Sequence, residues 1–244
     1  MQAVILAAGV AFRLRPLTNK TPKCLLKLAG KTILERTISN LLFNGINDFV
    51  IVTGYLQEQI KYFINSQFPS LNVKYIFNEK YEVTNNIYSL WLTKSEVGGK
   101  EFILLDSDII FDKAIVSLIT ESNYQNVLAL RSDDHLSEEE IKISLNSDGS
   151  IKEIGKVVSL EDAIGESIGI EKFSDLFSKK LFQLLDKIIL QENQTNIFYE
   201  AAFQRLIDSS EKIFTEDVGE LKCIELDTPE DLQKAEREII FYLQ

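Results

Sequence analysis

Histidine is almost absent from this sequence of 244 residues, which has only one, His135. His135 lies in an acidic stretch, where we expect an ordinary surface residue. Ser-His-Asp and Cys-His hydrolysis, His₃ zinc sites and HExxH proteases all need histidines at other positions. Chemistry in this chain must therefore use carboxylates, lysines, arginines and backbone amides.

Cysteine and long apolar runs are also scarce. Two cysteines, Cys24 and Cys223, are too few for a disulfide scaffold or a zinc cluster, and they fit a reducing cytoplasm. No apolar run approaches the roughly 18–20 residues of a membrane-spanning helix. The apolar start, MQAVILAAG, has no basic n-region and is not expected to be a signal peptide. We expect a cytoplasmic protein that does not insert into a membrane.

Basic residues are outnumbered by acidic ones. The 26 Lys and Arg against 37 Asp and Glu give a formal net charge of −11. This balance argues against nucleic-acid binding, which depends on clustered Lys and Arg. The hydrophobic share of 45% and charged share of 26% are usual for a folded soluble protein, and the length suits one large α/β domain.

Apolar runs typical of buried strands alternate with amphipathic helices in the first half of the chain. Parallel strands that are covered on both faces lack polar alternation, as these runs do. We therefore predict an α/β fold with a Rossmann-like, doubly wound and mostly parallel sheet over about residues 1–130. The predicted strands are 3–6, 49–52, 73–77 and 102–105, and the predicted helices are 32–45, 56–64 and 86–95.

The second half, residues 131–244, is predicted to be a small C-terminal elaboration of the same single domain, because no linker or repeat separates it. Asp148 and Gly149 supply a turn for a hairpin. Pro229, behind Asp227 or Thr228 as cap, starts a terminal helix. The predicted strands are 141–145, 151–154, 167–173 and 223–226, and the predicted helices are 175–191, 198–209 and 228–243.

The loop after the first strand is a candidate phosphate site. It follows the small residues Ala8 and Gly9, whose backbone N–H groups can form an anion-binding concavity, and Arg13 and Lys23 add positive charge. A Walker A loop is excluded, because Gly30-Lys31-Thr32 lacks the earlier glycine. No GxGxxG dinucleotide fingerprint follows a predicted strand.

Carboxylates follow two other predicted strands. Asp106 and Asp108 come at the carboxyl end of a buried strand, where open α/β sheets bind ligands. Paired carboxylates there are costly unless a cation holds them, and Mg²⁺ with a substrate phosphate satisfies that need. Asp227, which ends a late strand, is either a third contributor to this site or a helix cap.

These motifs together resemble the nucleotidyltransferase superfamily of sugar-phosphate and choline-phosphate enzymes, whose signature is LAAGxGxRLxPLTxxxPK. The similarity extends over essentially the whole chain. Where sugar-1-phosphate enzymes usually carry Gln-Pro-x-Gly, this chain has Asn-Asn-Ile-Tyr-Ser-Leu (residues 85–90), as in enzymes of the choline-phosphate cytidylyltransferase type. The resemblance implies a GT-A-like fold in which residues 1–130 bind nucleotide and residues 131–244 bind the acceptor. The other matching segments are 45–55, 78–81, 106–108 and 225–231.

The resemblance also implies roles for individual residues. Arg13, Lys23 and Lys156 would be catalytic, with Lys156 on the acceptor's phosphate. Asp108 and Asp227 would ligate Mg²⁺. The nucleotide would be bound by Leu6, Ala8, Gly9, Arg13, Lys23, Asn78, Asn86, Ser89 and Asp106. The acceptor would be bound by Lys156, Glu166, Tyr199 and Glu200, whose carboxylates would suit a cationic amine or polyol hydroxyls.

The expected reaction is Mg²⁺-dependent transfer of CMP from CTP to a small phosphorylated alcohol or phosphonate, with release of pyrophosphate. The resemblance also implies that the CDP-activated product would serve the synthesis of cell-surface polysaccharide or lipid. Two alternatives stay open: a sugar-1-phosphate nucleotidyltransferase that uses UTP, dTTP or GTP, and a non-catalytic nucleotide-binding homologue. The second arises because Ala11 and Phe12 replace the signature's second glycine and the small polar residue after it. The sequence does not decide the identity of the acceptor, nor whether the protein is a monomer or a homodimer.

Overall fold

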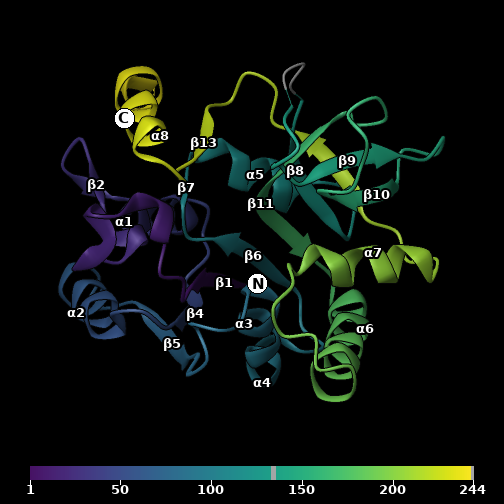
Figure 1. Ribbon diagram of the computed structural model, residues 1–244, viewed down its shortest axis with the longest axis horizontal. Helices are drawn as coiled ribbons and strands as arrows, with labels where there is room; N and C mark the ends of the chain where they lie inside the picture. Colours follow the sequence, from purple (N-terminus) through teal and green to yellow (C-terminus); the bar gives the residue numbers. More distant parts are fainter. Residues whose placement is uncertain (133–135, 243–244) are drawn as a thin grey trace.

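The computed structural model describes residues 1–132 and 136–242. His135 and Leu243, on which two of the sequence predictions fall, lie outside the described residues. At the centre of the molecule is a nine-stranded mixed sheet with helices on both faces (Figure 1). In the part of the chain that is described, no helix is both long and apolar enough to cross a bilayer.

The first half of the chain supplies the parallel strands of this sheet. They lie side by side in the order β6-β1-β4-β5 and are paired in parallel throughout. This arrangement confirms the Rossmann-like α/β prediction. The strands are β1 (Gln2–Ala7), β4 (Asp48–Thr53), β5 (Asn72–Phe77) and β6 (Phe102–Asp106).

The second half supplies antiparallel strands to the same sheet. The long strand β11 (Gly165–Phe173) pairs antiparallel with β6, and its other pairings are with β8 and β9. Its register against β8 shifts between Ser167 and Glu171, where Gly169 has a φ of +70°. The other strands are β8 (Val127–Arg131), β9 (Lys142–Leu145), β10 (Ile151–Gly155) and β12 (Phe214–Asp217).

Alternating side chains of β1 enter two different helical layers. Ala3 and Ile5 pack with helices α1, α2 and α5, whereas Val4 and Leu6 pack with α3, α6 and α7. Burial on both faces explains why these strands are apolar without alternation. The helices are α1 (Ile33–Phe43), α2 (Gln57–Gln67), α3 (Asn86–Leu92), α4 (Lys94–Val97), α5 (Ala114–Glu121), α6 (Asp175–Asp186) and α7 (Glu200–Asp208).

Several predicted helices end earlier than the sequence indicated. The helix predicted over 86–95 divides at Thr93, whose hydroxyl donates to the Leu90 carbonyl at 2.7 Å, into α3 and α4. The helix predicted over 175–191 changes to wider π-type turns after α6. The terminal helix α8 (Pro229–Lys234) does the same, and its cap is Thr228, which accepts from the Asp231 N–H.

Two short antiparallel pairs lie outside the main sheet. β2 (Lys27–Leu28) pairs with β3 (Lys31–Thr32). β7 (Ile109–Phe111) pairs with β13 (Cys223–Glu225). The second pair matters for function, because it joins the segment after β6 to the segment before α8.

Candidate active site

One cavity of about 920 Å³ opens at the carboxyl end of the parallel strands. The loop after β1, the start of α3, the ends of β6 and β13 and the strands of the second half all contribute to its wall. It brings together every predicted site residue except Tyr199. Those lining it are Leu6, Ala8, Gly9, Arg13, Lys23, Asn78, Asn86, Ser89, Asp106, Asp108, Lys156, Glu166, Glu200 and Asp227.

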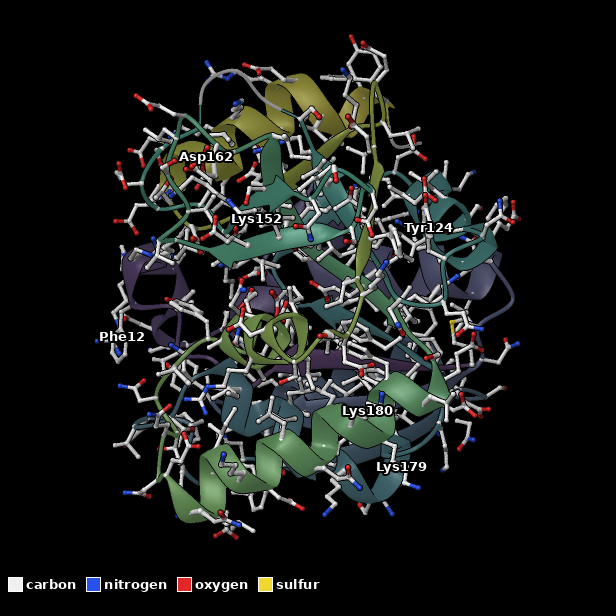
Figure 2. The ribbon with its side chains drawn as sticks, turned by 90° about the vertical axis from the view of Figure 1, so that its right-hand side faces the viewer. Phe12, Tyr124, Lys152, Asp162, Lys179 and Lys180 are labelled. Atoms are coloured by element: carbon white, nitrogen blue, oxygen red, sulfur yellow. The ribbon has the colours of Figure 1, made fainter. Side chains whose placement is uncertain are left out.

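The loop after β1 keeps its turn despite lacking the second glycine. Ala11 has φ 53° and ψ 57°, the left-handed conformation that glycine adopts without cost. Its carbonyl accepts the Thr18 hydroxyl at 2.8 Å, which fixes the turn. Phe12 is 62% exposed at the margin of the molecule (Figure 2), and the Arg15 guanidinium lies 4.4 Å from the centre of its ring. The loop thus accepts both substitutions, with strain at Ala11 and an exposed ring at Phe12.

The acidic residues of the cavity meet through the β7–β13 pair. Asp108 immediately precedes β7, and the Leu226 N–H donates to its carbonyl at 3.0 Å, which brings Asp227 alongside. The Lys23 ammonium then donates to Asp108 Oδ2 and to Asp227 Oδ1, each at 2.7 Å. Arg13 forms a further ion pair with Asp227. Positive and negative groups predicted for one site are therefore in direct contact.

Glu225 is a third carboxylate at this place, and the sequence analysis did not single it out. One oxygen from each of Asp108, Glu225 and Asp227 lies within 4.8 Å of the others. Burial, followed by repulsion from Asp108 and Asp227, raises the pKa of Glu225 to about 8. The acidic–apolar–acidic alternation of residues 225–227 at a strand end was the available signal, since it puts both carboxylates on one side.

These three carboxylates fit a Mg²⁺ ion. Mg²⁺ prefers oxygen ligands and is commonly held by one or two carboxylates together with substrate phosphates. Asp108 Oδ1 is buried and has no hydrogen-bond partner among the described residues. A bound cation would satisfy that oxygen and offset the repulsion that raises the pKa of Glu225.

Tyr199 is placed differently from the prediction. Its side chain is fully buried behind the cavity, so it cannot face an acceptor directly. Its hydroxyl lies 3.0 Å from Asp106 Oδ2 and 3.2 Å from Glu171 Oε1. The apolar ring packs against Phe203, which accounts for the inward orientation. Tyr199 therefore supports the floor of the cavity rather than lining it.

Asp106 and Glu171 are both carboxyl groups in a buried environment. Burial is the main cause that raises the pKa of each well above its usual value, and neighbouring carboxylates add to it. Gly169 faces Asp106, and a Cβ there would lie 2.8 Å from Asp106 Oδ2. The bulge in β11 thus needs glycine to leave room for this carboxylate.

Asn78 and Asn86 differ in what they can offer a ligand. The Asn78 amide donates to Thr84 and Ser89 hydroxyls at 3.1 Å, and its oxygen accepts the Lys80 N–H at 2.9 Å. Its polar atoms are therefore committed to shaping the 78–89 segment. Asn86 accepts the Tyr199 N–H at 2.9 Å, and no described residue contacts its Nδ2, which can donate into the cavity.

The wall of the cavity contributed by the second half of the chain combines a lysine, carboxylates and an aromatic ring. Lys156 pairs with Glu139 at 2.9 Å and lies 5.3 Å from the centre of the Phe198 ring. Glu200 is buried, with Oε2 lacking a described partner, and burial raises its pKa to about 7. Phe198 and Glu139 line the cavity but were missed, because a lone aromatic and a loop carboxylate carry no motif.

Glu166 is already engaged in the protein. It forms an ion pair with Arg131, which also donates to the Cys223 carbonyl at 3.3 Å. Both side chains line the cavity. The two cysteines, Cys24 and Cys223, are buried thiols beside it, and burial raises the pKa of Cys24 to about 12.

Comparison with known proteins shows which family and which structures this chain is similar to. The family model described as Nucleotidyl transferase matches residues 2–139. Choline-phosphate cytidylyltransferase of Streptococcus pneumoniae is 40% identical over 127 residues, which are 52% of this chain and 53% of that protein. CTP:phosphoglutamine cytidylyltransferase of Campylobacter jejuni is 28% identical over 255 residues, covering 96% of this chain and 98% of that protein.

Other relatives match different shares of their length. The bifunctional IPC transferase and DIPP synthase of Aquifex aeolicus is 31% identical over 98% of this chain but only 51% of its own length. This chain thus spans about half of the Streptococcus and Aquifex proteins it matches. Among solved structures, a CTP:phosphocholine cytidylyltransferase from Streptococcus pneumoniae superposes with a TM-score of 0.79 at 26% identity, covering 96% of this chain and 97% of that one.

Proposed function

We propose a specific reaction for this chain, which belongs to the nucleotidyl transferase family. It transfers CMP from CTP to an oxygen of the phosphate or phosphonate group of a small acceptor, and it releases pyrophosphate. The cytidylyltransferase relatives, which are named for phosphorylated small molecules, support the choice of CTP. The CDP-activated product would serve the synthesis of a cell-surface polymer or lipid.

The observation that carries this proposal is the composition of the cavity at the carboxyl end of the parallel strands. Arg13 and Lys23 lie beside the β1 loop, where a triphosphate would be bound, and Lys156 lies on the wall built by the second half of the chain. A volume of about 920 Å³ is at the upper end of the usual range for ligand pockets, which suits two ligands together. Such a cavity can hold a nucleotide and a phosphorylated acceptor in contact.

The chemistry requires positioning and charge neutralisation. An acceptor oxygen, already ionised at neutral pH, attacks the α-phosphorus of CTP and forms the new P–O bond. The bond between the α-phosphorus and the oxygen bridging to the β-phosphate breaks, and its electron pair leaves with pyrophosphate. Lys156 orients the acceptor, and Arg13 and Lys23 stabilise charge on the leaving group. No general base is needed, which agrees with the scarcity of histidine.

Asp108, Glu225 and Asp227 would hold Mg²⁺. When bound, the ion would neutralise phosphate charge and help to orient the phosphates for in-line displacement. Asp106, which lines the cavity and contacts the Tyr199 hydroxyl, would support the nucleotide. The backbone of Ala8 and Gly9 and the Asn86 amide complete the nucleotide side.

The acceptor is proposed to carry a positively charged or polyhydroxyl group besides its phosphate. Glu200 supports this choice, because its buried Oε2 has no hydrogen-bond partner among the described residues and would gain a hydrogen bond or an ion pair from such a group. The Phe198 ring beside it can contact a cation through its face. Glu166 is less available, since it already pairs with Arg131.

The test is pyrophosphate release with Mg²⁺, in which CTP, UTP, dTTP, GTP and ATP are crossed with phosphorylated alcohols, phosphonates and sugar 1-phosphates. We expect turnover with CTP and a non-sugar acceptor. In Asp108→Asn we expect turnover to fall by a factor of about 100 or more, because a charged metal ligand is lost. Asp175→Asn, an exposed position outside the cavity, is the matched control.

Two other results would point elsewhere. Turnover only with UTP, dTTP or GTP and a sugar 1-phosphate would replace the cytidylyl assignment. Nucleotide binding without pyrophosphate release in any combination would favour a non-catalytic homologue.

A further inference from the structure

Lys23 can pair either with the carboxylates of the cavity or with the phosphates of a bound nucleotide. Its ammonium group binds Asp108 and Asp227, yet the proposed function requires the same group on nucleotide phosphates and the same carboxylates on Mg²⁺. We infer that Lys23 makes metal binding conditional on nucleotide. It competes with the metal for the carboxylates until the phosphates of the nucleotide take it over. This inference rests on the proposed function, which supplies both ligands.

The contact between Lys23 and the two carboxylates is short and largely shielded from solvent. Both N–O distances are 2.7 Å, the length of strong charge-assisted hydrogen bonds. The Lys23 side chain is only 11% exposed, so solvent screens these bonds weakly. The oxygens involved, Asp108 Oδ2 and Asp227 Oδ1, belong to two of the three groups that fit a metal. A divalent ion therefore has to displace a well-held ammonium group.

The charge balance of the site also depends on Lys23. Three carboxylates converge here, and Lys23 and Arg13 are the cations in contact with them among the described residues. Removing Lys23 without replacing its charge would leave repulsion between carboxylates within 4.8 Å of one another. Nucleotide alone would thus be resisted by that repulsion, and metal alone would be resisted by Lys23. When both bind, the metal takes the place of Lys23 on the carboxylates and the phosphates take the place of the carboxylates on Lys23, so each of these groups keeps a partner of opposite charge.

Lys23 differs from the other cations of the cavity. The Arg13 side chain is 65% exposed and contacts Asp227 alone, so it is a weaker competitor. Lys156 pairs with Glu139 and contacts none of the three carboxylates. The competing effect should therefore follow the order Lys23, Arg13, Lys156.

The experiment measures Mn²⁺ binding to the full chain by electron paramagnetic resonance, without nucleotide. We expect Lys23→Met to bind Mn²⁺ more tightly than the unsubstituted chain, by a factor of about 10 or more, because one positive charge is removed from its site. With α,β-methylene CTP present, we expect the gap between the two proteins to shrink severalfold. A lysine that only supported local structure would give the opposite sign, a weaker metal site.

Controls and outcomes separate this inference from the proposed function. Arg13→Met should raise Mn²⁺ affinity less than Lys23→Met does, and Lys156→Met should leave it within about twofold. If Lys23→Met unfolds, Lys23→Gln is measured instead, and the rise in melting temperature on adding Mn²⁺ replaces the binding constant. Unchanged or weaker Mn²⁺ binding in the variant, with turnover intact in the unsubstituted chain, would overturn the inference alone. No Mn²⁺ binding by either protein, together with no turnover, would overturn the proposed function and the inference with it.

Discussion

Ala11 shows how a single residue can hold a phosphate loop in shape at an energetic cost. Its φ of 53° costs an L-residue about 1–2 kcal/mol, whereas glycine avoids most of that strain. Glycine also loses about 0.5–1 kcal/mol through greater freedom in the unfolded chain. We therefore expect Ala11→Gly to stabilise the fold by up to about 1 kcal/mol, measured by denaturant unfolding.

The control for this prediction is Ala163→Gly, because Ala163 has an ordinary negative φ and no strain to relieve. That variant should be less stable than the unsubstituted chain. The loop of the unsubstituted chain already adopts the left-handed turn at Ala11. The affinity for CTP should therefore change by no more than about twofold in Ala11→Gly. A large gain in turnover would instead show that Ala11 limits the reaction.

Glu200 should make stability depend on pH in a defined direction. Burial raises its pKa from 4.5 to about 7, so the folded protein keeps a proton there that the unfolded chain has lost. The contribution of this group to the free energy of unfolding is complete below about pH 4.5. It falls by about 3 kcal/mol as the pH rises to about 7. Glu200→Gln should remove this component, and its advantage over the unsubstituted chain should grow from pH 5 to pH 8.

The measurement is chemical unfolding of both proteins across that pH range. Glu220→Gln, at an exposed position, should parallel the unsubstituted chain. If Glu200→Gln also runs parallel, the buried carboxyl is not the group that titrates.

Sequence reasoning found the site residues that belong to motifs, and it failed for those defined only by packing. The alternation that puts Glu225 beside Asp227 was visible but not used. The resemblance placed both Tyr199 and Glu200 in the pocket, yet residues adjacent at the start of a helix point in different directions. Phe198 and Glu139 come from loops whose paths are set by distant contacts.

Tyr199 connects elements that are far apart in the chain. It precedes α7, and its hydroxyl reaches Asp106 at the end of β6 and Glu171 in β11, while its N–H binds Asn86 at the start of α3. Tyr199→Phe keeps the ring but leaves two buried carboxyl groups without that hydroxyl. We expect a loss of about 1–3 kcal/mol in stability and a fall in kcat by a factor of about 10–100, because the floor of the cavity shifts.

The matched control is Ser178→Ala, which removes a buried hydroxyl that donates to the Val97 carbonyl at 2.8 Å and lies outside the cavity lining. It should lose similar stability with kcat unchanged well below its melting temperature. Equal losses of kcat in both variants would mean that Tyr199 acts only through stability.

The four parallel strands of the sheet were predicted correctly, whereas several other strands were not. β1, β4, β5 and β6 were found because burial on both faces leaves an unbroken apolar run. β12 was missed because its sequence has no apolar run, and β7 was missed because its apolar run is only three residues long. The apolar strand β8 was not predicted either, and all three strands pair with segments distant in the chain. The wider turns after α6 and α8 depend on tertiary packing, which periodicity does not report.

At the scale of the whole molecule, we do not expect the boundary near residue 130 to separate two folding units. β11 pairs with β6 inside the sheet, and one hydrophobic cluster includes Val4 of β1, Phe173 of β11 and Phe203 of α7. We expect a fragment of residues 1–130 to lack a cooperative unfolding transition, because the edge of β6 and one sheet face would be exposed. Circular dichroism on heating measures this.

The full chain is the control and should unfold in one transition. A fragment of residues 1–130 that melts cooperatively would establish an independent nucleotide-binding unit. That result would contradict the single-domain prediction, which the shared sheet supports.

The alkylation rate of the two buried thiols can report how often the wall of the cavity opens. Cys24 and Cys223 both border the cavity, and an alkylating reagent reacts only with an exposed thiolate. Alkylation therefore requires the wall of the cavity to open, and the alkylation rate depends on how often it opens. Ligands that fill the cavity should lower the alkylation rate. Unlabelled acceptors can therefore be ranked by how much they lower this rate, measured by mass spectrometry, before any product is known.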